Sequence, residues 1–230
     1  MTIQEKIENY ISDYTRMKIG RLSLNCPYWS NRLKNGRVTV RGIFNGKGLS
    51  SQIKKELTKE VNLCQKKILN KYDLYKLAKR KRLGIDCSGF AFRVLEELVR
   101  LGYKNCKIAN LEGLYKGGIN RTNADMLTAK NFVFPVDKIS DYQMGDLIRM
   151  LGGRHIAVII KVTSNQIIYA HSSNKTKVQG VHLGKIKIVD INRPLLEQKW
   201  LEKTKTGENI VQKYFDPARG DGVFRLKIFV

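Results

Sequence analysis

The sequence predicts an α+β fold, in which one amphipathic helix packs against an antiparallel sheet. Three observations support this fold class. Apolar residues recur at helical spacing from Phe90 to Leu101, which indicates a helix with one buried face. Residues 155–162 and 166–173 are rich in β-branched side chains and are separated by turn-forming residues, which indicates a hairpin. With 230 residues and 42% hydrophobic content, the chain is long enough to bury a core.

The remaining elements follow in chain order. Residues 1–25 are expected to form an N-terminal amphipathic helix. Residues 50–83 combine near-helical apolar spacing with many lysines, which predicts one or two basic amphipathic helices inserted before Cys87. A short helix is expected within residues 122–129. The expected strands cover residues 146–150, 155–162, 166–173, 178–189 and 223–230, whereas residues 194–205 are expected to form a surface excursion.

Cys87 is expected in the first turn of its helix, directly after Asp86, whose carboxylate can cap the helix. Unpaired backbone N–H groups and the positive end of the helix dipole converge there, so the thiol should ionise more easily. The dipole contributes only roughly 0.3–1 kcal/mol, whereas each pKa unit requires about 1.4 kcal/mol. A reactive thiolate therefore needs a histidine partner.

The sequence contains three histidines. His155 opens the first strand of the hairpin and His171 lies near the end of the second, so both are expected at the end away from the turn. A two-residue turn alone would place them on opposite faces, because side chains alternate along a strand. We therefore predict a three-residue loop at residues 163–165, or a β-bulge with the same effect, that places both imidazoles on one face. His182 has no evident partner and is expected to be structural.

Four segments occur in an order that resembles the NlpC-type papain-like cysteine peptidases of bacterial cell walls. The first, residues 86–90 (Asp-Cys-Ser-Gly-Phe), resembles the nucleophile motif of that family. The others resemble its Gly-Asp turn, its strand that opens with the catalytic histidine, and its strand that carries the third polar residue. They are residues 144–148, 154–159 and 169–173. The resemblance covers residues 84–184, and the ordered set is more specific than the Asp-Cys-Ser-Gly tetrapeptide alone.

The resemblance implies a papain-like fold in a single domain, residues 1–230, with the nucleophile helix packed on a five- to six-stranded antiparallel sheet. Residues 84–184 would be the catalytic core, followed by C-terminal strands in residues 185–230. Cys87 would attack an amide carbonyl, His155 would be the base, and His171 would orient His155. The implied reaction is hydrolysis of a peptidoglycan stem peptide at the γ-D-glutamyl–diamino acid bond, with no metal or organic cofactor.

Two tyrosines are candidates for the second oxyanion donor, beside the backbone N–H of Cys87. Tyr75 has the family's spacing before the cysteine but lies in a lysine-rich helical stretch. Tyr28 has the family's local Pro-Tyr sequence but lies much farther back, and we favour Tyr28, with the intervening residues as an insertion. The resemblance also implies that Asp86 contacts a free amine of the substrate, in addition to capping the helix, and that Ser88 lines the site.

The formal net charge of +23 indicates an anionic partner or environment. Much of this charge lies in residues 51–82, whose lysines we expect to bind an anionic cell-wall polymer. Two alternative functions stay open: an amidase or acyl/transpeptidase with the same Cys-His-His site, and a basic nucleic-acid-binding protein with an inactive site. Nucleic acid is the less favoured partner, because no base-stacking aromatic pattern accompanies the lysines.

Apolar runs, the first residues and the cysteines indicate where the protein can act. It has no run of 18 apolar residues, so we expect no membrane span. Its first residues lead into an amphipathic helix rather than a continuous apolar stretch, so we expect action at the cell wall to require another export route, or a leader outside this sequence. Besides Cys87, the cysteines are Cys26, Cys64 and Cys106, an odd number without metal-ligand spacing, which argues against a disulfide framework.

Overall fold

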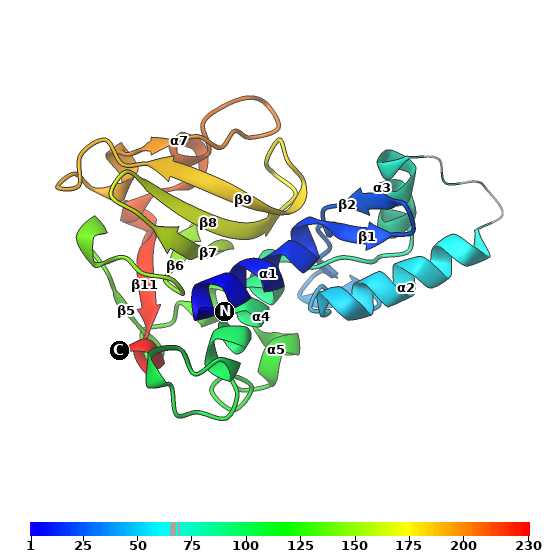
Figure 1. The fold of residues 1–230 in the computed structure, drawn as a ribbon, viewed down its shortest axis with the longest axis horizontal. Helices are drawn as coiled ribbons and strands as arrows, with labels where there is room; N and C mark the ends of the chain where they lie inside the picture. The colour runs from blue at the N-terminus through cyan, green and yellow to red at the C-terminus, as the bar shows by residue number, and fades with distance from the viewer. Residues whose placement is uncertain (65–67, 69) are drawn as a thin grey trace.

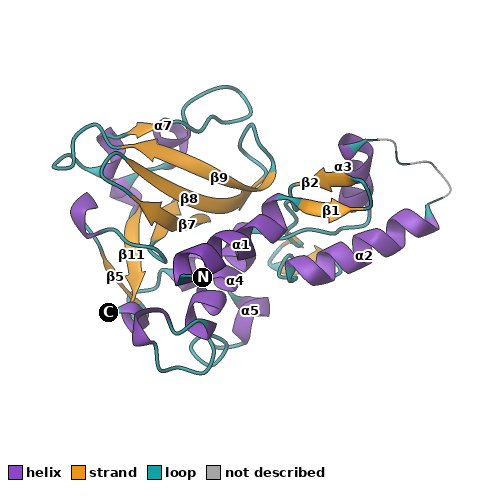
Figure 2. Cartoon of the chain, in the orientation of Figure 1, coloured by secondary structure: helices purple, strands orange, loops and turns teal. Residues whose placement is uncertain are grey.

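The computed structural model of the protein describes residues 1–64, 68 and 70–230. Within these residues, seven strands form one antiparallel sheet, and the helices α1 (Ile3–Thr15) and α4 (Cys87–Arg100) pack against it (Figures 1 and 2). The predicted fold class is therefore confirmed as mixed helix and antiparallel sheet. The sheet has seven strands in the described residues, however, so the expected number of five to six is wrong.

The sheet combines five strands that the sequence predicts with two that it does not. In order across the sheet, the strands are β10 (Lys199–Trp200), β9 (Gly180–Lys187), β8 (Gln166–Ser173), β7 (His155–Val162), β6 (Leu147–Met150), β11 (Gly222–Leu226) and β5 (Val133–Pro135). The two unpredicted strands, β5 and β10, have only three and two residues and lie at the two edges. Such short strands contain too little alternation to be recognised in a sequence.

Alternate residues of the central strands belong to two separate cores. Ile156 and Val158 of β7 pack in the core shared with α1 and α4. Ala157 and Ile159 belong to the second core, which the C-terminal part of the chain, including α7 (Ile210–Tyr214), helps to form. Burial on both faces explains why β7 is a nearly continuous apolar run rather than an alternating one.

The basic insertion forms two helices, α2 (Ser50–Leu63) and α3 (Lys71–Arg80), as predicted. They pack against a hairpin of the N-terminal segment, whose strands are β1 (Met17–Ile19) and β2 (Leu22–Leu24). The β1–β2 hairpin and the insertion therefore make one lobe, which lies beside the main sheet (Figure 1). The helix expected over residues 1–25 thus ends at Thr15, and the hairpin follows it. The buried apolar residues of the lobe include Met17, Ile19, Leu24, Ile53, Leu57, Leu74, Leu77 and Ala78.

The remaining elements are short. They are β3 (Arg32–Lys34), β4 (Arg37–Val40), α5 (Gly118–Arg121), α6 (Ala124–Leu127) and the 3-10 turns Tyr103–Asn105, Ile139–Asp141, Leu195–Glu197, Pro217–Arg219 and Lys227–Phe229. The α6 helix lies inside the stretch expected to be helical. None of the helices in the described part of the chain is long and apolar enough to cross a membrane.

Residues 194–205 are not the surface excursion that the sequence predicts. Trp200 is 2% exposed, and its indole N–H donates to the Leu195 carbonyl. Thr204 is 1% exposed. Polar and charged neighbours alternate with these buried residues, which hides the segment's packing role in the sequence.

Candidate active site

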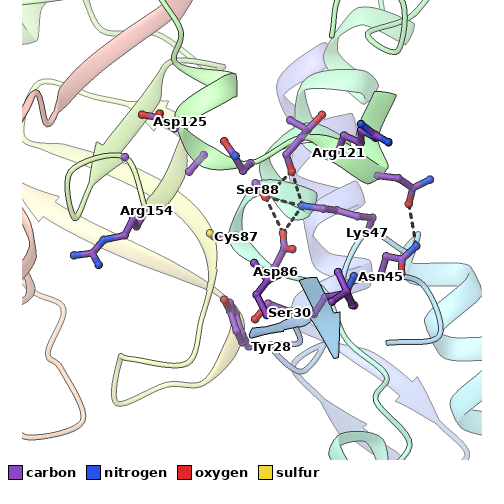
Figure 3. A pocket seen from close by; sticks show the side chains of 18 of the residues that line it. Tyr28, Ser30, Asn45, Lys47, Asp86, Cys87, Ser88, Arg121, Asp125 and Arg154 are labelled. Carbon is purple, nitrogen blue, oxygen red and sulfur yellow. Dashed lines mark hydrogen bonds and ion pairs between the residues drawn. The ribbon is translucent and has the colours of Figure 1, made fainter. Parts of the chain in front are cut away.

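Cys87 is the first residue of α4, and its side chain is almost completely buried. Asp86 caps the helix as predicted, because its Oδ1 accepts the Gly89 N–H at 2.6 Å. Cys87 also lines a cleft of about 810 Å³ (Figure 3). The walls of this cleft come from the β3–β4 hairpin, from α5 and α6, and from the turn at residues 152–154.

The β7–β8 hairpin places His155 and His171 on one face, as predicted. The pairing shifts register at a β-bulge between Ile159 and Lys161, while the turn itself stays tight, with Val162 opposite Ile167. The bulge, rather than a three-residue loop, therefore supplies the odd residue. Nε2 of His155 lies 2.8 Å from Nδ1 of His171, which is a hydrogen bond between the two rings.

Cys87 meets this hairpin at the start of β7. The backbone N–H of Ile156, the residue after His155, faces the Cys87 thiol as a hydrogen-bond donor. This contact opposes the rise of the thiol pKa. No hydrogen bond joins Cys87 Sγ to the His155 ring among the residues that the structure describes. The cysteine and the histidine thus lie at the same strand end without a direct bond, an arrangement that ligand-free active sites often have.

Burial dominates the protonation of both groups. It raises the pKa of the Cys87 thiol to about 12, with Asp86 adding to the rise and Lys47 opposing it. Burial also lowers the pKa of His155 to about 3, with His171 acting in the same direction and Glu202 against it. The expectation that the helix N-terminus eases ionisation is therefore outweighed, because the resting thiol and imidazole are both neutral.

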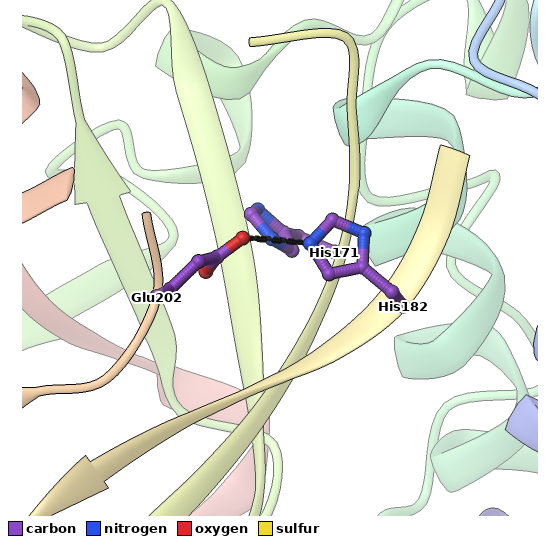
Figure 4. Close-up of side chains that lie close together, drawn as sticks. All are labelled: His171, His182 and Glu202. Carbon is purple, nitrogen blue, oxygen red and sulfur yellow. Dashed lines mark hydrogen bonds and ion pairs between the residues drawn. The ribbon is translucent and has the colours of Figure 1, made fainter. Parts of the chain in front are cut away.

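Behind His171, a second set of polar groups closes the site (Figure 4). Nε2 of His171 lies 3.0 Å from Oε1 of Glu202 and 3.0 Å from Nε2 of His182. Nε2 of His182 lies 2.6 Å from the same carboxylate oxygen, and its Nδ1 donates to the Gly180 carbonyl at 2.9 Å. The Tyr169 hydroxyl donates to the other oxygen, Oε2. We call His155, His171, His182, Glu202 and Tyr169 the sheet-side network.

The sheet-side network contains a donor set that could hold a divalent metal ion. One ligand atom each from His171, His182 and Glu202 lies within 4.8 Å of the others. Hydrogen bonds already account for all three atoms. A metal ion on Nε2 of His171 would also require a proton on Nδ1, so that His155 Nε2 could only accept. The donor set fits a metal ion, but only in a form in which Nδ1 of His155 is protonated.

On the cleft side, Lys47 forms a network that the sequence does not predict. Its Nζ lies 2.8 Å from Asp86 Oδ1, 2.6 Å from Ser88 Oγ and 2.9 Å from the Thr122 carbonyl oxygen (Figure 3). Lys47 is only 6% exposed and the side chain of Asp86 is 14% exposed, so the ion pair is largely buried. We call Lys47, Asp86, Ser88 and Thr122 the cleft-side network. Because Asp86 already has a cationic partner, its expected contact with a substrate amine would have to compete with Lys47.

A glycine makes this network possible. A Cβ at Gly89 would lie 2.4 Å from the Gly46 carbonyl oxygen, so only glycine lets the Gly46–Lys47 backbone approach the first turn of α4. That backbone also accepts the Asp86 N–H at 2.9 Å. The glycine of the Asp-Cys-Ser-Gly motif therefore has a packing role here.

The two candidate tyrosines lie in different places. Tyr28 lines the cleft beside Cys87, and it pairs with Ile85 through an isolated parallel bridge. Burial raises the pKa of Tyr28, and Cys87 raises it further, so its hydroxyl is a donor next to the thiol. Tyr75 lies on α3, donates to Gln179 at 3.4 Å and is not among the residues that line the cleft.

The structure brings the predicted residues Cys87, His155, His171 and Tyr28 to one region of the molecule. It adds Lys47, His182 and Glu202, none of which the sequence predicts as part of the site. His182 is directly opposite His171 in the β8–β9 pairing, so strand register could have connected them. Glu202 lies two residues after Trp200 of the unpredicted strand β10, whose pairing with β9 brings it to the site, and no local sequence pattern indicates this contact.

No family model, no curated protein and no solved structure matches this chain. The case for a function therefore rests on the ordered motifs and on the geometry around Cys87.

Proposed function

We propose that the protein is an NlpC-type, papain-like cysteine peptidase that hydrolyses an amide bond in peptidoglycan stem peptides. The observation that carries the proposal is the 2.8 Å hydrogen bond from His155 Nε2 to His171 Nδ1, at the strand end that Cys87 reaches. A cysteine at a helix N-terminus, a histidine and a third group that orients the histidine are the parts of a nucleophilic acyl-transfer site. The γ-D-glutamyl–diamino acid bond is the substrate that the family resemblance favours.

The chemistry needs His155 as a proton carrier. Nε2 is engaged by His171, so Nδ1 is the nitrogen that takes the Cys87 proton as Sγ attacks the carbonyl carbon. The S–C bond forms, the C–N bond breaks, and His155 gives the proton to the departing amine. Water then attacks the thioacyl carbon, His155 takes one of its protons, and the Cys87 thiol leaves with that proton as the acid product forms. Because both resting groups are neutral, proton transfer accompanies the attack on bound substrate.

The cleft side supplies electrostatic help. The backbone N–H of Cys87 at the first residue of α4, and the hydroxyl of Tyr28 in the lining of the same cleft, are the donors we assign to the negative charge that develops on the carbonyl oxygen. The cleft is also bordered by Arg121 and Arg154, which favours substrates with carboxylate groups. Stem peptides carry such groups on their D-amino acids.

The test is product analysis on purified stem peptides. The wild-type protein should release a new amine and a free acid, and acid quenching should trap the acyl group on Cys87. Cys87→Ala should abolish both products, and His155→Ala should reduce the rate by about 10²–10⁴-fold, the usual contribution of a general base. Cys64→Ala is the matched control and should keep full activity, because Cys64 lies in the lobe of α2 and α3. Transfer of the acyl group to an added amine instead of water would assign a transferase, and no thioacyl adduct would refute the site.

We also propose that the basic helices hold the enzyme on an anionic cell-wall polymer. The exposed cations there are Lys54, Lys55, Lys59, Lys71, Lys76, Arg80 and Arg82. Among the described residues of this segment, Lys59 forms an ion pair with Glu56, and Lys81 forms one with Glu60. Lys66 and Lys67 lie outside the described residues. Binding to a phosphate-rich wall polymer should be measurable at low salt and should weaken as salt rises. Binding that is insensitive to salt, or to Lys54→Gln/Lys55→Gln, would contradict this role.

A further inference from the structure

We propose that Glu202 is a positioning residue that sets the tautomer of His155 through His171, an inference that rests on the proposed function. Glu202 does not contact the reacting atoms. It lies behind His171, and its side chain is 8% exposed. Glu202 would therefore be a buried carboxylate that decides which nitrogen of the base is free to accept the thiol proton.

Glu202 accepts hydrogen bonds from three donors. Its Oε1 faces a nitrogen of His171 and a nitrogen of His182, and its Oε2 accepts the Tyr169 hydroxyl. Because a carboxylate can only accept, each of these partners must present a proton to it. His182 also donates from Nδ1 to the Gly180 carbonyl, so its ring carries a proton on both nitrogens.

The protons of the two other rings follow from this contact. His171 carries its proton on Nε2, where it faces Glu202, and a ring with one proton leaves Nδ1 bare. A bare Nδ1 can only accept, so the 2.8 Å bond to His155 must be donated by His155 Nε2. His155 is neutral as well, and its Nδ1 is therefore the free base.

Backbone hydrogen bonds hold Glu202 in place. Trp200 pairs with Ile186 of β9, and the Leu201 N–H donates to the Lys185 carbonyl at 3.0 Å. The Asn209 side chain donates to the Trp200 carbonyl at 3.1 Å. These bonds fix the backbone directly before Glu202, as a positioning role requires.

Glu202 is a nearby charge that favours the protonated form of His155. His171, His182 and Lys175 lower the pKa of His155, whereas Glu202 raises it. Cys87 approaches from α4 as a neutral thiol. When His155 takes the Cys87 proton, Glu202 is thus the counter-charge that stabilises the imidazolium across the His171 ring.

Histidine tautomers can be read directly, without any activity, in the protein labelled with nitrogen-15 histidine. Long-range proton–nitrogen spectra distinguish a protonated Nδ1 from a protonated Nε2 in each of the three rings. The wild type should show His155 with its proton on Nε2. A proton on Nδ1 of His155 in the wild-type protein would overturn the proposal without any variant.

Glu202→Gln is the decisive variant, because the amide keeps the shape and removes the charge. An amide nitrogen turned to His171 would reverse the chain of donors, so part of the His155 signal should move to the Nδ1-protonated form. The kcat on stem peptides should fall by about 10–100-fold, and KM should stay within about twofold. The matched control is Glu208→Gln, because the Glu208 side chain is half exposed and bonds to Lys213 and Thr206, away from the histidines.

Failure of the role of Glu202 and failure of the peptidase activity give different results. A folded Glu202→Gln protein with wild-type kcat and an unchanged His155 tautomer would overturn the role of Glu202 while leaving the peptidase intact. A wild-type protein with no thioacyl adduct on Cys87 would instead refute the proposed function, and the tautomer spectra would still decide what Glu202 does.

Discussion

Two buried polar networks flank Cys87, and they differ in what they can do. The cleft-side network joins two side chains of opposite charge, Lys47 and Asp86, to the first turn of α4. The sheet-side network consists of imidazole rings that end on Glu202. An ion pair fixes the position of its side chains. In a row of hydrogen-bonded imidazoles, the nitrogen that carries the proton in one ring also determines which nitrogen carries it in the next. One side of Cys87 therefore holds the nucleophile in position, and the other side controls where the proton lies.

The largest expected effect comes from breaking the cleft-side network. Lys47→Met removes the cation but keeps an apolar side chain of similar length, so Asp86 becomes a buried carboxylate without its ion-pair partner. Such a loss costs roughly 3–5 kcal/mol in the free energy of unfolding. Urea unfolding of wild type and variant measures it directly.

The double variant Lys47→Met/Asp86→Asn sharpens this result. It removes the uncompensated charge, and the side-chain oxygen of the introduced asparagine can still accept the Gly89 N–H that Asp86 accepts now. It should therefore recover part of the lost stability. If Lys47→Met alone unfolds at the wild-type urea concentration, the ion pair has no structural role.

Much of the site could be predicted because its parts are local or periodic. Cys87 follows a capping residue and precedes an apolar helix face, and the histidines mark equivalent ends of one hairpin. Because side chains alternate along a strand, the two histidines can share a face only if one extra residue interrupts the regular pairing. The β-bulge near Ile160 met that requirement, although the sequence could not distinguish it from a longer turn.

The unpredicted parts depend on contacts between distant segments. Lys47 reaches Asp86 across 39 residues, and Glu202 reaches His171 across 31. Neither lysine nor glutamate is unusual in a chain with 43 basic and 20 acidic residues, so composition gives no signal for these two. The high pKa of Cys87 was also missed, because a helix dipole can be inferred from the sequence but the burial that outweighs it cannot.

The smaller expected effect is a pH dependence of stability that belongs to the sheet-side network. The pKa of His155 is lowered from 6.5 to about 3 in the folded protein, mainly by burial. Between these values the unfolded chain binds a proton that the folded chain does not. The free energy of unfolding therefore falls as pH drops below about 6.5, and His155 alone contributes up to about 2 kcal/mol of this loss at pH 5. The lowered pKa of His171 acts in the same direction.

Urea unfolding at pH 7 and pH 5 tests this difference between the networks. His155→Gln removes the titrating ring, so the loss of stability from pH 7 to pH 5 should be smaller than in the wild type. Cys87→Ala is the control and should keep the wild-type loss, because a thiol with a pKa of about 12 stays protonated at both values. Equal losses in His155→Gln and the wild type would show that His155 is not buried as a neutral ring. The sheet-side network would then share the fixed, structural character of the cleft side, and the assignment of proton control to it would fail.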